Sequence, residues 1–209
     1  MNIKPKYYNF VVTAMFTAII FILQFTPIGF IPLGFINATI IHIPVILGSI
    51  LLGPKYGAFL GGMFGAASLV RNTLQPVLIS FVFSPLIPIP GSDHGSAWAL
   101  LVCFIPRIMV GVIPYYVYQL LNKHKFVNWL ALPLAAIAGS LTNTLVVMHF
   151  IFFLFRDAYA NAMGLAITAV YSAILGIIAF IGVPEAIVAG VIVTVLGKVL
   201  LKSTTANAT

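Results

Sequence analysis

Charge is what this sequence has least of. Its 209 residues include ten Lys/Arg and three Asp/Glu, which together make 6% of the chain, whereas 62% of the residues are hydrophobic. A soluble domain typically uses about a quarter charged residues to keep its surface hydrated. So few charges suit a protein whose solvent is mostly lipid. The composition therefore predicts an all-α polytopic membrane protein, with residues 1–209 forming a single transmembrane domain.

Several kinds of chemistry are excluded by what is missing. One cysteine, Cys103, allows neither a disulfide within the chain nor a multi-cysteine metal site, and no His/Asp/Glu cluster has metal-ligand spacing. The chain has no Gly-x-x-x-x-Gly-Lys-[Ser/Thr] loop for ATP, no Gly-x-Ser-x-Gly nucleophile and too few carboxylates for a catalytic pair. We therefore expect no enzyme activity, no cofactor and no metal. The net charge of +7 is not arranged as a basic stripe with aromatic residues, so nucleic acid is not an expected partner either.

Apolar stretches separated by turn-rich or charged breaks predict six membrane-spanning helices. At 1.5 Å per residue, a span needs roughly 17–25 residues, so the second is short and the fifth is long enough to tilt or protrude. The predicted spans are residues 8–25, 38–52, 56–72, 98–121, 129–155 and 184–201.

The apolar stretch before the sixth span is ambiguous. A single helix from Met163 to Leu201 would be about 58 Å long, far more than a bilayer requires. The sequence therefore predicts a re-entrant or outer-surface helix that ends at the Gly182-Val183-Pro184 break.

The lysines set the orientation. With six spans and a cytoplasmic N-terminus, seven of the ten basic residues fall on the cytoplasmic side, where positive charge is favoured. The inverted orientation would place every lysine outside. We therefore expect a protein of the cell membrane with both termini in the cytoplasm.

Two of the predicted outer connections are unusual. Residues 26–37 and 75–97 are rich in proline and glycine, and the second also carries Phe81, Phe83 and Leu86. Long loops that are apolar and stiffened by proline are typical of lids and binding loops, because a disordered linker would be polar. The sequence thus predicts two ordered outer loops and places ligand binding on the outer face.

Polar groups within the predicted spans are candidates for that binding. A central charge in a bilayer costs about 2.5–3.5 kcal/mol on insertion scales, so each one needs a reason. Arg107 and Asn143 both reach the middle third of the bilayer, and Glu185 opens the sixth span. Arg107 either forms a structural ion pair with Glu185 or offers a planar fork to an anionic ligand. Asn143 either joins two helices by a hydrogen bond or contacts the ligand. A lone histidine such as His42 is more often a packing residue than a ligand-binding one.

Small residues recur at four-residue spacing. Gly57, Gly61 and Gly65 form one such series in the third span, and Ala14 and Ala18 form another in the first. Small residues let helices approach closely inside a membrane, so the general expectation is packing between helices.

The run from Asn37 to Gly61, with His42-Ile-Pro44 and Gly53-Pro-Lys-Tyr-Gly57, resembles the second and third spans of S components of energy-coupling factor (ECF) transporters. These small membrane subunits bind a vitamin for uptake. The match continues through residues 64–69 and 80–85. The Ala14-x-x-x-Ala18 pair matches the Ala-x-x-x-Ala signature with which the family contacts its transmembrane T component.

This resemblance implies a division of labour. An S component captures its vitamin under the first and third loops, while a T component and two ATP-binding-cassette ATPases supply the energy. The candidate substrate-binding residues are Arg107, Asn143, Asn37, His42, Asn72, Ser84 and Glu185, and the candidate partner interface is Ala14 and Ala18.

The identity of the vitamin follows less directly. The chain looks most like S components assigned to pantothenate, and an arginine with an asparagine suits a small carboxylate that carries amide and hydroxyl groups. Riboflavin and folate stay open as substrates. A self-sufficient secondary transporter is the other alternative; it would need an internal inverted repeat and coupling-ion ligands, which we do not find.

Overall fold

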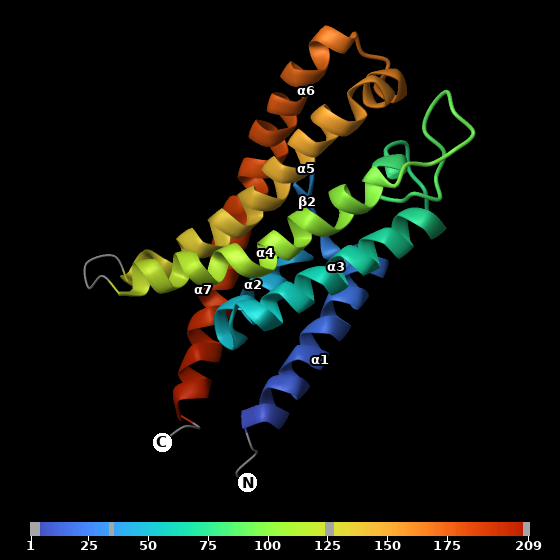
Figure 1. Cartoon of the computed structure of the whole chain (residues 1–209). Helices are drawn as coiled ribbons and strands as arrows, with labels where there is room; N and C mark the ends of the chain where they lie inside the picture. The colour runs from blue at the N-terminus through green and yellow to red at the C-terminus, as the bar shows by residue number, and fades with distance from the viewer. Residues whose placement is uncertain (1–4, 34–35, 124–127, 207–209) are drawn as a thin grey trace.

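A computed structural model describes residues 5–33, 36–123 and 128–206. These residues form six helical rods and one short β-hairpin (Figure 1). Four helical segments are long and apolar enough to cross a membrane, namely residues 7–25, 98–122, 128–163 and 167–202. The all-α, polytopic membrane fold is confirmed. The helices are α1 (Pro5–Phe25), α2 (His42–Leu52), α3 (Pro54–Leu74), α4 (Trp98–Asn122), α5 (Ala131–Met163), α6 (Val170–Ile177) and α7 (Val183–Ala206).

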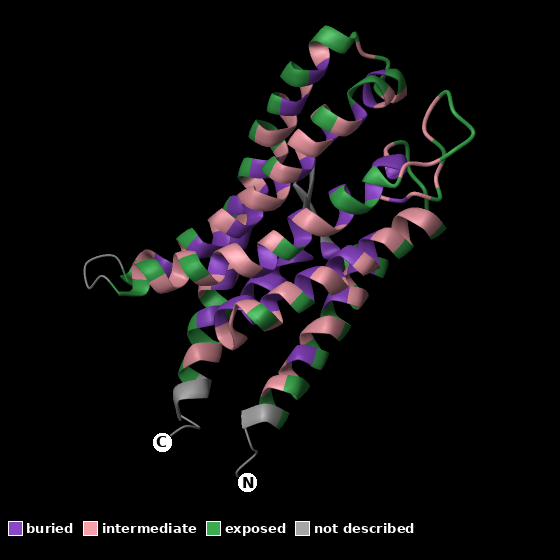
Figure 2. Cartoon of the chain, in the orientation of Figure 1, coloured by how far each residue is buried: buried purple, intermediate pink, exposed green. Residues whose placement is uncertain are grey.

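The short helix α2 lies at the centre of the bundle. Every residue from His42 to Ile50 is buried, and α2 packs against α1, α3, α4 and α7. Figure 2 shows buried residues concentrated where the helices cross and exposed residues along their outer faces. Many of those exposed side chains are large and apolar, such as Phe10 and Phe153. Such an outer surface is suited to lipid rather than water.

The second helix begins later than the sequence predicted. Residues 38 and 39 belong to strand β2 (Ile36–Thr39), which pairs antiparallel with β1 (Phe30–Leu33), so that Phe30 faces Thr39. Proline is tolerated in the first turn of a helix, but deeper in a helix its ring collides with the carbonyl four residues earlier. Pro44 therefore requires a start near His42.

The predicted break at Gly182-Val183-Pro184 is wrong, and so is the separate re-entrant or surface helix before it. The structure has one continuous helical rod from Ile167 to Lys202, about 54 Å long, which also contradicts a start of the sixth span at residue 184. A π-helical segment, Ile178–Gly182, joins α6 to α7, and the Val183 amide donates to the Ile178 carbonyl. This wider turn lets the rod continue past Pro184, whose ring and missing N–H would disrupt a regular α-helix.

The fifth helix is also longer than predicted. α5 continues to Met163, with a kink at Phe155, where the backbone leaves helical geometry (φ −134°, ψ 18°). The distal part of α5 and α6 extend side by side at the top of the molecule in Figure 1. Both long rods therefore exceed what a bilayer requires.

The second outer connection, residues 75–97, is ordered and packs onto the bundle. It contains a short 3₁₀ helix, Ser80–Val82, whose three residues are buried. Phe81 packs edge-on against Phe155 of α5, with ring centroids 6.0 Å apart. The loop thus closes over the region between α3, α4 and α5.

Candidate functional site

A cavity of about 370 Å³ lies inside the bundle. Residues from α1, β2, α3, the second outer connection, α4, α5, the π-helical segment and α7 contribute to its wall. Much of the wall is apolar, but the polar groups in it come from six different elements. They include Gln24, Thr39, Arg71, Arg107, Asn143 and Glu185, and Ser68, Thr144 and Tyr159 also line the cavity.

Arg107 is the central charge of this cavity. Its side chain is 7% exposed, and its Nη1 donates a hydrogen bond of 2.9 Å to the carbonyl of Val102 in the same helix. The guanidinium carbon lies 4.9 Å from the ring centroid of Phe83 and 5.5 Å from that of Phe64, a cation–π arrangement. Its Nε has no hydrogen-bond partner among the described residues. Arg107 is thus held in place and still has donor capacity.

Unpartnered polar atoms are concentrated at this cavity. Among the residues that the structure describes, five buried side-chain nitrogen or oxygen atoms have no hydrogen-bond partner, and three of them belong to cavity-lining residues: Gln24 Oε1, Arg107 Nε and Asn143 Oδ1. Buried polar atoms are normally hydrogen-bonded, because an unmet group costs about 1–3 kcal/mol. The cavity therefore has the properties of a site for a polar ligand that supplies the missing partners.

Glu185 does not compensate Arg107 directly. No ion pair joins these two described residues; instead, Glu185 Oε1 accepts hydrogen bonds from the Thr39 backbone N–H (2.7 Å) and the Thr39 hydroxyl (2.9 Å). The Glu185 carboxylate therefore attaches the end of the β-hairpin to the start of α7. The expected alternative role of Arg107, a structural ion pair with Glu185, is not formed in this structure.

Asn72 and Ser84 hold the second outer connection rather than line the cavity. The Asn72 amide donates to the Ser68 carbonyl (2.8 Å) and its Oδ1 accepts from the Ser80 hydroxyl (2.8 Å). The Ser84 hydroxyl lies 2.7 Å from that of Thr73. In the structure, both residues tie the connection to the end of α3.

Three of the predicted site residues, Arg107, Asn143 and Glu185, line the same cavity. His42 is buried at the start of α2, has an unpartnered Nε2 and lies outside the cavity lining. The side chain of Asn37 lies outside the described part of the chain.

Gln24, Thr39 and Arg71 line the cavity but were missed in the sequence. A signal for Gln24 was present: Thr13, Ile20 and Gln24 are buried at helical spacing on α1, so this glutamine lies on the inner face of its helix. Thr39 was missed because no sequence pattern predicted the hairpin that carries it.

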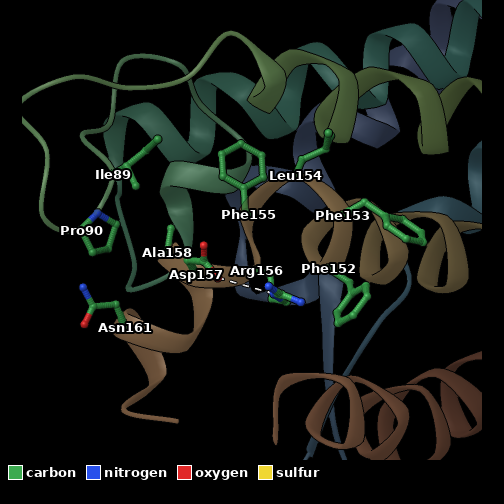
Figure 3. Close-up of a pocket in the computed structure, with 10 residues that line it drawn as sticks. All are labelled: Ile89, Pro90, Phe152, Phe153, Leu154, Phe155, Arg156, Asp157, Ala158 and Asn161. Atoms are coloured by element: carbon green, nitrogen blue, oxygen red, sulfur yellow. Dashed lines mark hydrogen bonds and ion pairs between the residues drawn. The ribbon is translucent and has the colours of Figure 1, made fainter. Parts of the chain in front are cut away.

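A second and larger hollow, about 730 Å³, lies between the second outer connection and the kink of α5 (Figure 3). Arg156 and Asp157 pair there at 3.5 Å; the Arg156 side chain is about half exposed and that of Asp157 is mostly exposed. Ile89 and Pro90 border it from the connection, and Asn161 lies opposite Pro90 in Figure 3. Its two charges are exposed and paired with each other, and none of its lining residues is among the described residues that have a buried, unpartnered polar atom.

A third hollow, about 790 Å³, lies on the outer surface between α1 and α3. Ala14 and Ala18 contribute to it, and larger side chains surround them: Phe10, Lys55, Tyr56 and Phe59. We call it the α1–α3 groove.

The fold and the cavity define a class: a polytopic helical membrane protein that encloses a site for a small polar ligand. The chain belongs to the ECF transporter substrate-specific component family, whose family model matches residues 9–197. The family resemblance expected from the sequence is therefore confirmed, and this is a family of transport subunits rather than of enzymes.

Two curated relatives and one solved structure are similar to this chain. The pantothenic acid transporter PanT of Lactococcus lactis subsp. cremoris (strain MG1363) is 39% identical over 158 residues, covering 76% of this chain and 74% of the relative. The pantothenate transporter PanT of Leuconostoc mesenteroides subsp. mesenteroides (strain ATCC 8293) is 30% identical over 213 residues, covering 96% and 94%. The 2.1 Å crystal structure of the S-component for biotin from an ECF-type ABC transporter aligns with a TM-score of 0.49 and 20% identity, covering 95% of each chain.

Proposed function

We propose that this chain is the pantothenate-binding subunit of an ATP-driven vitamin importer and that pantothenate occupies the cavity around Arg107. The observation that carries the proposal is that three buried side-chain atoms without a hydrogen-bond partner among the described residues belong to residues lining this one cavity. The two relatives named as pantothenate transporters support the choice of vitamin.

The chemistry of the ligand matches that of the wall. Pantothenate carries a carboxylate, an amide and hydroxyl groups. The carboxylate would accept hydrogen bonds from the Arg107 guanidinium, whose planar fork suits it, and would neutralise the buried charge. Asn143 would hydrogen-bond the ligand's amide or hydroxyl groups, because its side chain can both donate and accept. The cavity, at about 370 Å³, falls within the usual range for small-molecule sites. Riboflavin has no carboxylate and would leave Arg107 uncompensated.

The energy would come from other subunits. The chain has no ATP-binding loop, so we propose that a transmembrane T component and two ATP-binding-cassette ATPases drive uptake. The α1–α3 groove, with Ala14 and Ala18 in its wall, supports a contact with another membrane helix. We also propose that both termini lie in the cytoplasm, as the lysine distribution favours.

The binding site is tested by titrating folded, detergent-purified protein with pantothenate and with its uncharged alcohol analogue. Truncating one partner of a buried charged pair costs about 2–5 kcal/mol, so Arg107→Ala should weaken pantothenate binding some thirty-fold to several thousand-fold. Arg107→Lys should restore only part of the affinity, because the bidentate fork is lost. The wild type should strongly prefer the carboxylate form.

Arg156→Ala is the matched control. This arginine is about half exposed and lies in the hollow between residues 75–97 and the kink of α5, away from the Arg107 cavity lining. It should bind pantothenate like the wild type. Equal binding of both ligands by the wild type, or normal binding by Arg107→Ala, would show that no carboxylate meets Arg107.

A further inference from the structure

We infer that Gln24 is a specificity-determining residue of the cavity, one that accepts a hydrogen bond from a hydroxyl or N–H group of the ligand. This inference rests on the proposed pantothenate site. It adds a contact on the α1 wall of the cavity, apart from the Arg107 contact proposed for the carboxylate. It makes α1 a ligand-contacting helix.

The environment of Gln24 differs from that of the two threonines of α1. Thr13 and Thr17 satisfy their hydroxyls within the helix, by donating to the carbonyls of Asn9 (2.7 Å) and Thr13 (2.9 Å). Gln24 is 5% exposed, and its Oε1 has no partner among the described residues. It lines the cavity in the last turn of α1. A buried amide oxygen without a partner among the described residues therefore lines the cavity that a ligand would occupy.

Gln24 and Arg107 reach the cavity from different walls. α1 packs on α2 and α3, whereas α4, which carries Arg107, packs on α3 and α5. The two side chains also offer opposite chemistry, because a guanidinium can only donate and an amide oxygen accepts. The site would thus favour a ligand with an anionic group and, away from it, hydrogen-bond donors.

This arrangement would let the site distinguish ligands that carry a hydrogen-bond donor from analogues that lack it, in addition to raising the affinity for the former. A ligand that lacks the donor leaves the buried Gln24 oxygen unmet, and a site built to hydrogen-bond a hydroxyl rejects analogues without it for that reason. The experiment therefore compares pantothenate with an analogue in which hydrogen replaces the hydroxyl groups. Gln24→Met is the main variant, because it keeps a long unbranched side chain and removes the amide.

The wild type should bind pantothenate more tightly than the analogue. Gln24→Met should weaken pantothenate about 5- to 150-fold and leave the affinity for the analogue nearly unchanged. Gln24→Leu gives the same comparison if the methionine variant does not fold. Ser49→Ala is the matched control: its Oγ is also buried and unpartnered, but it lies outside the cavity lining, so both affinities should stay at wild-type values.

The outcomes separate the two proposals. Equal loss of both ligands in Gln24→Met, or equal wild-type affinity for both, would make Gln24 a structural residue and would leave the pantothenate site standing. A wild type that binds no pantothenate would overturn the proposed function and this inference together.

Discussion

Arg107 and Glu185 carry opposite charges, line the same cavity and yet form no ion pair. Each is held by neutral groups: Arg107 by a backbone carbonyl and two aromatic rings, and Glu185 by the two donors of Thr39. A direct pair would satisfy both charges at the expense of the donors that a ligand needs. By binding Thr39 instead, Glu185 leaves the donors of Arg107 for the proposed anionic ligand.

The hydrogen bonds between Thr39 and Glu185 should stabilise the β-hairpin. Thr39→Val removes the hydroxyl donor and keeps the backbone one, and a hydrogen bond to a charged group is worth about 1.5–3 kcal/mol. We expect amide hydrogen exchange in β2 to become faster, with little change in the helices. Thr26→Val is the control, because the Thr26 hydroxyl donates only to the Ile22 carbonyl of α1. Unchanged protection of β2 in Thr39→Val would show that the contact does not hold the hairpin.

The sequence predicted how deep in the membrane a polar residue lies, but not which groups it hydrogen-bonds. Counting residues along the apolar runs placed Arg107 and Asn143 at one level, and the structure puts both in the same cavity. Asn72 and Ser84 were among the candidate substrate-binding residues, but in the structure nearby side chains and backbone satisfy them. Gln24 was overlooked because its place on the inner face of α1 follows from its helical spacing to Ile20, which composition does not show.

At the level of elements, two prolines act in opposite ways. Pro44 fixes the start of α2, while Pro184 lies inside a helical rod that continues past it. The difference depends on packing: a methyl group on Gly182 would lie 2.8 Å from Thr144 Cγ2, so α5 and the π-helical segment are in close contact there. A sequence shows the proline but not the neighbouring helix that stabilises a π-bulge, so the predicted break was wrong.

The contact between α3 and α4 depends on glycine. A methyl group on Gly57 would collide with the carbonyl oxygen of Gly111, and one on Gly111 with that of Gly57. Overpacking a tight contact typically costs 1–3 kcal/mol. We expect Gly57→Ala and Gly111→Ala each to lower the free energy of unfolding of the detergent-purified protein by about 1–3 kcal/mol, which a thermal unfolding experiment would detect as a lower melting temperature.

Gly62→Ala is the control on the same helix, since nothing lies within 4 Å of a methyl group there. It should be neutral or slightly stabilising, because alanine favours the helix over glycine. If all three variants unfold alike, the close approach of α3 to α4 is not what fixes their packing.

At the scale of the whole molecule, both chain ends lie at the same end of the bundle in Figure 1, and the second outer connection lies towards the other. Together with the lysine distribution, this predicts opposite membrane sidedness for a reporter after Thr209 and one inserted within residues 92–96. The C-terminal reporter should be cytoplasmic. A C-terminus found outside would invert the proposed orientation, and with it the face from which the vitamin enters.

The helix α1 faces two environments. Its inner side carries Ile20 and Gln24, while Ala14 and Ala18 are exposed on the surface of the α1–α3 groove. Gln24 lies six positions after Ala18, or about 9 Å along the helix. One helix thus borders both the proposed ligand site and the proposed partner surface. The two roles can be separated by substitution because they lie on different sides of the helix.

Ala14→Trp and Ala18→Trp test the partner surface. In lipid, helices associate through close packing of small residues, so a tryptophan in the groove would keep a partner helix at a distance. We expect either variant to block vitamin uptake and assembly with the T component and the ATPases in reconstituted membranes, whereas the purified chain still binds pantothenate with wild-type affinity. Ile22→Trp is the control, because Ile22 is 56% exposed on the same helix and lies outside the groove lining; it should assemble normally. Normal uptake by both alanine variants, or concentrative uptake by this chain alone in proteoliposomes, would contradict a partner at this groove.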